Sequence, residues 1–274
     1  MVRLCLKLIT LPLLFLIFSC DRIEYSPNQI FDSKSPTDLN KKQLEILYQK
    51  EKESSSDTIR FILTGDTQRA YDQAVHLVRE ANKIKDLDFV LLNGDISDFG
   101  LLQEMKWISS IYQDLNVPFI TIIGNHDLVA NGMQVYQKMF GELNFNFTYK
   151  GVKFICHDAN SREYQFNGSI PDINWLSEQL KEENNLNVEG IIGISHIPPR
   201  SYDFDPNLRK EYEELFNSNS KVIACLHSHE NVSETFYPFP DSIPFIVTNA
   251  VQNREFLYVE IVNGKMIKHE NVIY

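Results

Sequence analysis

The chain has 274 residues, of which 43% are hydrophobic and 23% are charged, a composition typical of a globular protein with a substantial core. Its formal net charge of −11 argues against a groove for a nucleic-acid duplex, because basic side chains supply most of the affinity for a duplex. The acidic charge does not exclude small phosphates or nucleotides, since bound metal ions locally reverse the sign of the field.

Residues 1–19 have the pattern of a bacterial lipoprotein signal peptide. Two basic residues precede an apolar run from Leu8 to Phe18, which is too short to span a bilayer as a stable helix. The run leads into Ser19-Cys20, which resembles a lipobox, where the cysteine becomes the acylated first residue. We therefore expect a lipoprotein of the bacterial cell envelope, periplasmic or surface-facing, with membrane contact through a lipid on Cys20. A short membrane anchor and an ordinary cleaved signal are the alternatives.

Residues 20–57 are polar and mixed in charge, with several clusters of Ser, Pro and Asn. This composition predicts a flexible tether behind the lipid anchor, with one helical piece around Lys41–Lys52. A tether of this kind holds a globular domain away from the membrane.

From residue 58 onward, apolar strands alternate with amphipathic helices. The apolar runs Ile59–Leu63, Phe89–Leu92 and Phe119–Ile123 are separated by helical patterns, which indicates right-handed crossovers between parallel strands. Further strands are predicted at Phe145–Tyr149, Val152–His157, Gly190–Ser195, Lys221–Leu226, Pro244–Thr248, Phe256–Ile261 and Met266–His269, and helices at Ile173–Glu183 and Leu208–Phe216. No repeat or second linker interrupts the pattern, so we expect residues 58–274 to form one α/β domain.

The two cysteines of this region, Cys156 and Cys225, fall inside predicted strands. The sequence is compatible both with a disulfide between them and with two buried thiols in neighbouring strands. No CxxC motif occurs, so a thiolate zinc site is not indicated.

Clusters of polar residues follow the ends of five predicted strands. They are Gly65-Asp66-Thr67-Gln68, Gly94-Asp95-Ile96-Ser97-Asp98, Gly124-Asn125-His126-Asp127, Ser195-His196 and His227-Ser228-His229. Because ligands bind at the carboxyl ends of strands in open α/β sheets, we expect these clusters to converge. Carboxylate oxygen together with imidazole nitrogen suits divalent transition metals. A turn or helix cap explains each cluster alone, so the indication comes from their combination.

In this order the clusters resemble the motifs of the calcineurin-like metallophosphoesterases. The resemblance covers residues 58–230, and its most specific elements are Gly-Asn-His-Asp at 124–127 and Gly-Asp-x-x-Asp at 94–98. It implies a four-layer α/β/β/α sandwich of two mixed sheets flanked by helices, with two divalent metal ions such as manganese, iron or zinc. Two residues depart from the family pattern: Gln68 stands where the family usually has His, and Leu226 where it has Gly.

The resemblance also implies a role for each site residue. One metal is held by Asp66, Gln68 and His229, the other by Asn125, His196 and His227, and Asp95 bridges them. A hydroxide between the metals then attacks a phosphomonoester or phosphodiester, with His126, oriented by Asp127, as general acid or transition-state stabiliser. Asp98 is expected to support the metal ligands through hydrogen bonds.

Three arginines on loops beside the motifs are candidates for binding a substrate anion: Arg69, Arg162 and Arg200. Solvated loop charges are the alternative for each of them. The expected function is hydrolysis of a small phosphate ester, with no binding of a nucleic-acid duplex. The alternative is a lipid-anchored binding protein of the same fold with little hydrolytic activity, because Gln68 weakens the first metal site.

Overall fold

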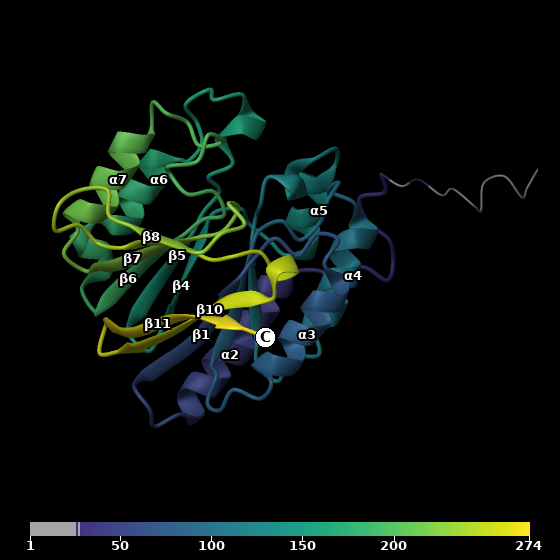
Figure 1. Cartoon of the computed structure of the whole chain (residues 1–274), viewed down its shortest axis with the longest axis horizontal. Helices are drawn as coiled ribbons and strands as arrows, with labels where there is room; N and C mark the ends of the chain where they lie inside the picture. The colour runs from purple at the N-terminus through teal and green to yellow at the C-terminus, as the bar shows by residue number, and fades with distance from the viewer. Residues whose placement is uncertain (1–25, 27) are drawn as a thin grey trace, which may run out of the picture.

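The computed structural model describes residue 26 and residues 28–274 (Figure 1). The predicted signal peptide and Cys20 therefore lie outside the described residues. Within the part that is described, no helix is both long and apolar enough to cross a membrane.

Two mixed sheets form the centre of the fold. The first has the strand order β11-β10-β1-β2-β3 and the second the order β4-β5-β6-β7-β9-β8. Their bounds are β1 (Thr58–Thr64), β2 (Phe89–Asn93), β3 (Phe119–Ile122), β4 (Phe145–Tyr149), β5 (Val152–Cys156), β6 (Gly190–Ile194), β7 (Val222–His227), β8 (Glu234–Phe236), β9 (Phe245–Val247), β10 (Glu255–Val262) and β11 (Lys265–Ile273). The strands β1, β2 and β3 are parallel, as are β5, β6, β7 and β9.

Helices cover the outer face of each sheet. The first sheet packs against α3 (Tyr71–Ala81), α4 (Leu102–Tyr112) and α5 (Gly132–Met139), and the second against α6 (Ile173–Leu180) and α7 (Arg209–Ser218) (Figure 1). Short 3-10 turns, η2 (His126–Leu128), η3 (Ser161–Tyr164), η4 (Glu182–Asn185) and η5 (Val251–Asn253), lie in the connections. The predicted four-layer α/β/β/α sandwich is therefore confirmed.

The layer between the sheets is apolar and rich in aromatic rings. Phe61 of β1 stacks on Phe89 of β2 with 5.1 Å between ring centroids, and Phe154 of β5 meets both rings edge-on. All three side chains are fully buried. Because side chains alternate between the faces of a strand, residues that pack between the sheets alternate with residues that face the helices. This packing fixes the two sheets together, and with them the polar loops at their strand ends.

The helix α2 (Leu39–Glu53) lies against the edge strands β3 and β4. Its Asn40 side chain donates to the carbonyl oxygen of Thr121 at 2.9 Å and accepts from the Thr121 backbone N–H at 2.8 Å. Leu47 is fully buried in the layer between the sheets. The predicted helical piece is confirmed, but a flexible tether is the wrong description of these residues, because the apolar face of α2 completes the core. The folded domain thus begins before residue 58.

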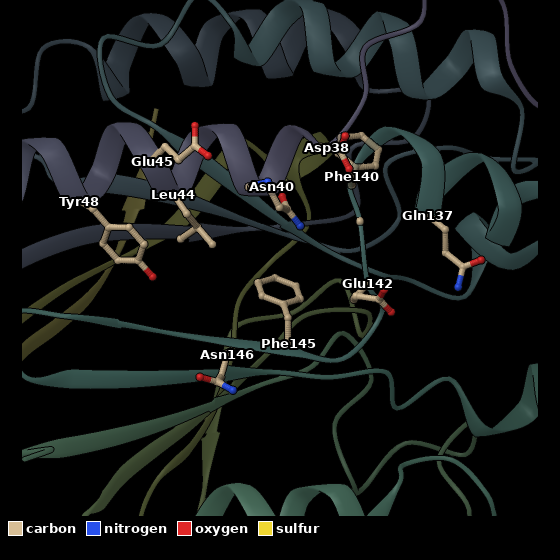
Figure 2. Close-up of a pocket in the computed structure, with 12 residues that line it drawn as sticks. Asp38, Asn40, Leu44, Glu45, Tyr48, Gln137, Phe140, Glu142, Phe145 and Asn146 are labelled. Carbon is tan, nitrogen blue, oxygen red and sulfur yellow. The ribbon is translucent and has the colours of Figure 1, made fainter. Parts of the chain in front are cut away.

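A half-open cavity of about 580 Å³ lies between α2 and the start of β4 (Figure 2). Its walls include the apolar side chains of Leu44, Tyr48 and Phe145, and Glu45 and Glu142 also line it. None of the residues that line it belongs to the strand-end clusters. This cavity is therefore separate from the polar clusters, which lie at the carboxyl ends of the parallel strands.

The two cysteines of the domain are free, buried thiols. Cys156 lies in β5 and Cys225 in β7, and the strand β6 runs between them. Cys156 packs in the layer between the sheets, whereas Cys225 packs on the helix-covered face. The alternative of two buried thiols is therefore confirmed, although β6 separates their strands. The thiols point to opposite faces of the sheet, where no disulfide can join them.

Candidate metal centre

The five polar clusters converge where the parallel strands of both sheets end. Asp66 follows β1, Asp95 follows β2 and Asn125 follows β3, while His196 follows β6 and His227 ends β7. Asp95, His196 and His229 each offer one ligand atom, and these atoms lie within 4.8 Å of one another, a spacing compatible with a metal centre. The predicted convergence is thus present in the fold.

The centre of the cluster is the fully buried imidazole of His196. Its Nε2 atom lies 3.4 Å from Oδ2 of Asp95 and 4.0 Å from Oδ1 of Asp66. Burial by itself lowers the pKa of His196, but the carboxylates of Asp95 and Asp66 outweigh it and raise the pKa to about 10. Burial raises the pKa of Asp66 to about 7, although the nearby His196 opposes this change. The carboxylates of Asp95 and Asp66 therefore favour a positive charge in this small buried volume, a place that a metal ion would take in exchange for the His196 proton.

The hydrogen bonds around His227 leave one of its ring nitrogens with a lone pair that can bind a metal. The hydroxyl of Ser195 donates to the carbonyl oxygen of Ile197 at 3.2 Å and lies 3.0 Å from Nδ1 of His227. Because the Ser195 proton is engaged, Nδ1–H of His227 donates to the Ser195 oxygen, and Nε2 keeps its lone pair. Burial lowers the pKa of His227 to about 3, so the ring is neutral, as a metal ligand has to be.

Among the described residues, four of the predicted ligands have a buried polar atom without a hydrogen-bond partner, and the chemistry of these atoms shows whether a metal fits the site. Within the described part of the chain, these atoms are buried and make no hydrogen bond: Gln68 Oε1, Asn125 Oδ1, His196 Nε2 and His227 Nε2. A buried polar atom without a partner is costly, and most such atoms in proteins are satisfied. All four are oxygen or nitrogen donors of the kind that binds divalent transition metals, so the residues fit the metals that the family resemblance implies.

The backbone of the cluster is shaped for close approach of the strand-end loops. A Cβ atom on Gly124 would lie 2.1 Å from the backbone nitrogen of Asp95 and 2.3 Å from its Oδ1, so only glycine fits there. Asp66, Asp95 and His229 have positive φ angles of 55°, 54° and 74°, a conformation that side chains other than glycine seldom adopt. Such backbone strain concentrates at functional sites, where the surrounding structure holds it in place.

His126 lies at the edge of the cluster and is 39% exposed. Its backbone N–H donates to Oδ1 of Asp95 at 3.0 Å, and its ring Nδ1–H donates to the carbonyl oxygen of Asp98 at 2.9 Å. Burial lowers the pKa of His126, but Asp95 and the Asp98 carbonyl outweigh it, and the pKa is raised overall. The ring is thus held by one nitrogen while the other is left for a ligand. Asp98 was expected to support the metal ligands, but its backbone carbonyl holds His126, which is not an assigned ligand, and its carboxylate pairs with Arg69.

Asp127 does not hold the His126 ring. Its carboxylate accepts hydrogen bonds from the backbone N–H groups of Gly124, Ile96 and Ser97 at 2.8–3.2 Å, and from the Ser97 hydroxyl at 2.9 Å. The sequence-based role of Asp127 in orienting His126 is therefore wrong. The fully buried carboxylate ties the loop after β2 to the loop after β3, and the Asp98 carbonyl orients the histidine instead.

The three arginines proposed for substrate binding are each paired with a carboxylate. Arg69 Nε donates to Oδ2 of Asp98 at 2.6 Å, and Arg162 Nη1 donates to Oδ1 of Asp203 at 2.8 Å. Arg200 lies 3.6 Å from Glu234 and over the ring of Phe236. The side chains of Arg69 and Arg162 stay 71% and 62% exposed, so their remaining N–H groups are accessible from solvent.

Sequence reasoning missed two residues that organise the site. Asn93, at the end of β2, donates to the Ser195 carbonyl at 2.9 Å and to the Ser228 hydroxyl at 3.0 Å, which joins the two sheets directly beneath the cluster. Asp203 lies on the loop after His196, and its Oδ2 is 3.1 Å from Nε2 of His229. The Asn-Gly-Asp pattern could have drawn attention to Asn93, whereas no local pattern marks Asp203.

The comparison with known proteins agrees with this site. The family described as calcineurin-like phosphoesterase matches residues 59–232. The chain is 29% identical to a probable cyclic nucleotide phosphodiesterase of Fibrobacter succinogenes over 122 residues, which is 43% of the chain. It is 28% identical to a probable glycerophosphodiester phosphodiesterase of Arcobacter nitrofigilis over 165 residues, which is 55% of the chain. These matches span 45% and 59% of the relatives, so the chain covers about half of their length.

A solved structure gives the same fold. The dimetal phosphatase from Danio rerio superposes with a TM-score of 0.59 over 79% of this chain and 99% of that one, at 12% identity. A likeness at such low identity supports the architecture, whereas the family match covers more than half of the sequence and includes all five polar clusters. The chain therefore belongs to the calcineurin-like phosphoesterase family.

Proposed function

We propose that this protein is a metal-dependent hydrolase of small phosphate esters, with a phosphodiester as the preferred class. The observation that carries the proposal is the cluster of Asp95, His196 and His229, whose ligand atoms lie within 4.8 Å of one another. Among the described residues, predicted ligands on the neighbouring strand-end loops add buried donor atoms that make no hydrogen bond. The relatives named above are described as probable phosphodiesterases, which favours a diester over a monoester. Family membership supports phosphoester chemistry in general.

We further propose which residues hold the metals. Asp95 is assigned to both ions, because its Oδ2 lies 3.4 Å from Nε2 of His196 and 3.1 Å from the side-chain amide nitrogen of Gln68, two residues that are assigned to different ions. The first ion is assigned to Asp66, Gln68 and His229, and the second to Asn125, His196 and His227. When bound, two such divalent ions activate a water molecule and neutralise charge on the phosphoryl oxygens.

The chain itself supplies the proton for the leaving group. His126 has Nδ1 committed to the Asp98 carbonyl, so its Nε2 is the nitrogen available to substrate. Asp95 and the Asp98 carbonyl raise the pKa of His126, which favours the imidazolium form that a general acid needs. Arg69 borders the same loop and is a candidate for binding a substrate anion through its exposed N–H groups, together with Arg162 and Arg200.

A panel of substrates tests the proposal. Purified domain is freed of metal, reloaded with manganese, and assayed with matched aryl, alkyl and nucleotide phosphates, each as monoester and diester. We expect metal-dependent hydrolysis with the highest kcat/KM for a diester. Absence of hydrolysis across the whole panel by protein that has bound its metal would contradict the proposal.

One observation favours a second candidate, a binding protein with weak activity. Gln68 directs its amide nitrogen to Oδ2 of Asp95 at 3.1 Å, so the amide has to reorient before its oxygen serves the first ion. The metal content separates the two candidates, because two ions per chain favour the hydrolase and one or none favours the binding protein.

We also propose that the protein is a lipoprotein of a bacterial envelope, anchored through Cys20. The support is the basic and apolar pattern of residues 1–19 followed by Ser19-Cys20. Intact mass measurement of the mature protein tests this directly. The expected result is an N-terminal Cys20 with attached acyl chains, and an unmodified N-terminus at any other residue would contradict it.

A further inference from the structure

We propose that Asp203 is a positioning residue of the metal centre, which fixes the ring of His229 so that its Nδ1 atom presents a lone pair to a divalent cation. The inference rests on the proposed function in one respect, since it takes His229 as a metal ligand. It concerns a residue of the loop after β6 that lies outside the five polar clusters.

Both oxygens of the Asp203 carboxylate are engaged. Oδ2 lies 3.1 Å from Nε2 of His229, and Oδ1 accepts from Nη1 of Arg162 at 2.8 Å. The side chains of Asp203 and His229 are largely buried, with 17% and 16% of their surfaces exposed. A carboxylate with both oxygens occupied in this way is suited to holding a neighbour in place.

The carboxylate determines which ring nitrogen of His229 carries the proton. A carboxylate only accepts hydrogen bonds, so Nε2 of His229 is the protonated nitrogen and Nδ1 keeps its lone pair. Histidines that bind metals usually donate their other N–H to a carboxylate or carbonyl, which fixes the ring and strengthens the ligand.

Arg162 and the backbone hold Asp203 itself. The backbone N–H of Arg162 donates to the carbonyl oxygen of Asp203 at 3.2 Å, in addition to the side-chain contact. The backbone N–H of Asp203 donates to the Ser201 hydroxyl at 3.3 Å. Arg162 on η3 is therefore linked to the loop after β6 by two hydrogen bonds, and the chain Arg162–Asp203–His229 leads from the surface to the metal centre.

The network has a specific consequence for this chain. His229 is assigned to the same ion as Gln68, and an amide is a weaker ligand than the imidazole that the family usually has at that position. A carboxylate partner raises the basicity of His229, which offsets part of this loss. Through His229, Asp203 thus supports binding of the first ion, whose ligands include the weaker amide of Gln68.

Calorimetric titration of metal-free protein with Co²⁺ tests the proposal, with the visible absorption of bound Co²⁺ recorded in parallel. Asp203→Ala should weaken the binding of one of the two ions by about 10–100-fold and leave the other unchanged. Asp203→Asn keeps an oxygen acceptor for Nε2–H, so its loss should be smaller. Arg162→Gln should give a loss smaller than that of Asp203→Ala, because the carboxylate stays but is less firmly held.

Glu230→Gln is the matched control, since it removes one negative charge from the exposed residue next to His229. If Glu230→Gln weakens metal binding as much as Asp203→Ala does, the effect comes from net charge, and the proposal is overturned. It is also overturned if Asp203→Ala binds both ions within twofold of the wild-type affinity. If both Asp203 variants lose one ion completely and change the Co²⁺ spectrum, Asp203 is itself a ligand, which also overturns the positioning role. The titration reports on binding without turnover, so an inactive wild type that binds Co²⁺ normally would contradict the proposed hydrolysis and leave this inference intact.

Discussion

The Nδ1–H group of His196 donates a 2.7 Å hydrogen bond to the carbonyl oxygen of Asn93, which directs Nε2 of the same ring towards Asp95, 3.4 Å away. The bond crosses from the second sheet to the first, because His196 follows β6 and Asn93 ends β2. A backbone carbonyl thus selects the tautomer that a metal ligand needs. The packing of the two sheets therefore determines how the His196 ring is oriented.

Replacing His196 by Ala should remove about one metal ion per chain and lower turnover at least about 100-fold, because a metal ion supplies several kcal/mol of transition-state stabilisation. Metal content by mass spectrometry and kcat/KM on an aryl diester check this. His269→Ala, on an exposed position of β11, is the control and should change neither quantity. Full metal content in the His196 variant would contradict the ligand assignment.

Replacing His126 by Gln should lower kcat by about 10²–10⁴-fold while both metals stay bound, since the residue donates a proton and is not assigned as a ligand. The loss should be greater for an alkyl diester than for a nitrophenyl diester, because a poor leaving group depends more on the proton. Steady-state kinetics on the two substrates give the comparison. Equal losses on both would argue that His126 acts by binding the phosphoryl group.

Replacing Asp127 by Ala should lower the free energy of unfolding by about 3 kcal/mol or more, because four buried donors lose their acceptor. Urea denaturation with a chelator present separates this effect from metal binding. An Asp127 that only oriented His126 would give a variant of normal stability and reduced turnover, and that pattern would refute the structural role assigned here.

The buried His157 predicts a pH dependence of stability. Its Nε2 lies 3.0 Å from the Tyr212 hydroxyl, and burial lowers its pKa from 6.5 to about 4. As the pH falls, the unfolded chain takes up the proton first. The stability contributed by neutral His157 is therefore complete above about pH 7, falls between pH 6.5 and about 4, and is gone below that range. The loss amounts to roughly 3 kcal/mol.

The matched variant for this test is His157→Gln, which keeps a neutral polar side chain at the same position. Urea denaturation of metal-free protein from pH 8 to pH 4 should show a wild-type stability that falls relative to the variant between pH 6.5 and 4, with a constant difference above pH 7. Parallel curves throughout this range would mean that His157 titrates normally in the folded protein.

Much of the fold was predictable because its elements are locally encoded. The apolar runs at Phe89–Leu92 and Phe119–Ile123 and the helices between them follow directly from the periodicity of hydrophobic residues. The docking of α2 was not predictable in this way, since the helix is polar over most of its length and its few apolar residues become buried only against strands far away in sequence. Short elements such as α5 and β8 carry too few residues for a periodic pattern.

The residues of the site were likewise predictable only in part. The motifs predicted which side chains gather at the strand ends, because the carboxyl ends of parallel strands share one edge of each sheet. They did not predict the partners of those side chains. The assignment of Asp127 failed because its carboxylate accepts from the Gly124 and Ile96–Ser97 backbone and from the Ser97 hydroxyl, contacts that no motif indicates. Asp203 was missed because its contact with His229 joins two loops that no local pattern relates.

If the buried donors at the strand ends bind the divalent ions on which hydrolysis depends, activity follows metal content. Metal is removed from the purified domain, and manganese is then added stepwise while a nitrophenyl diester is turned over. We expect activity to disappear on removal and to return in proportion to metal bound, with full activity at two ions per chain. Turnover that persists in metal-free protein, or metal binding that restores none, would contradict this expectation.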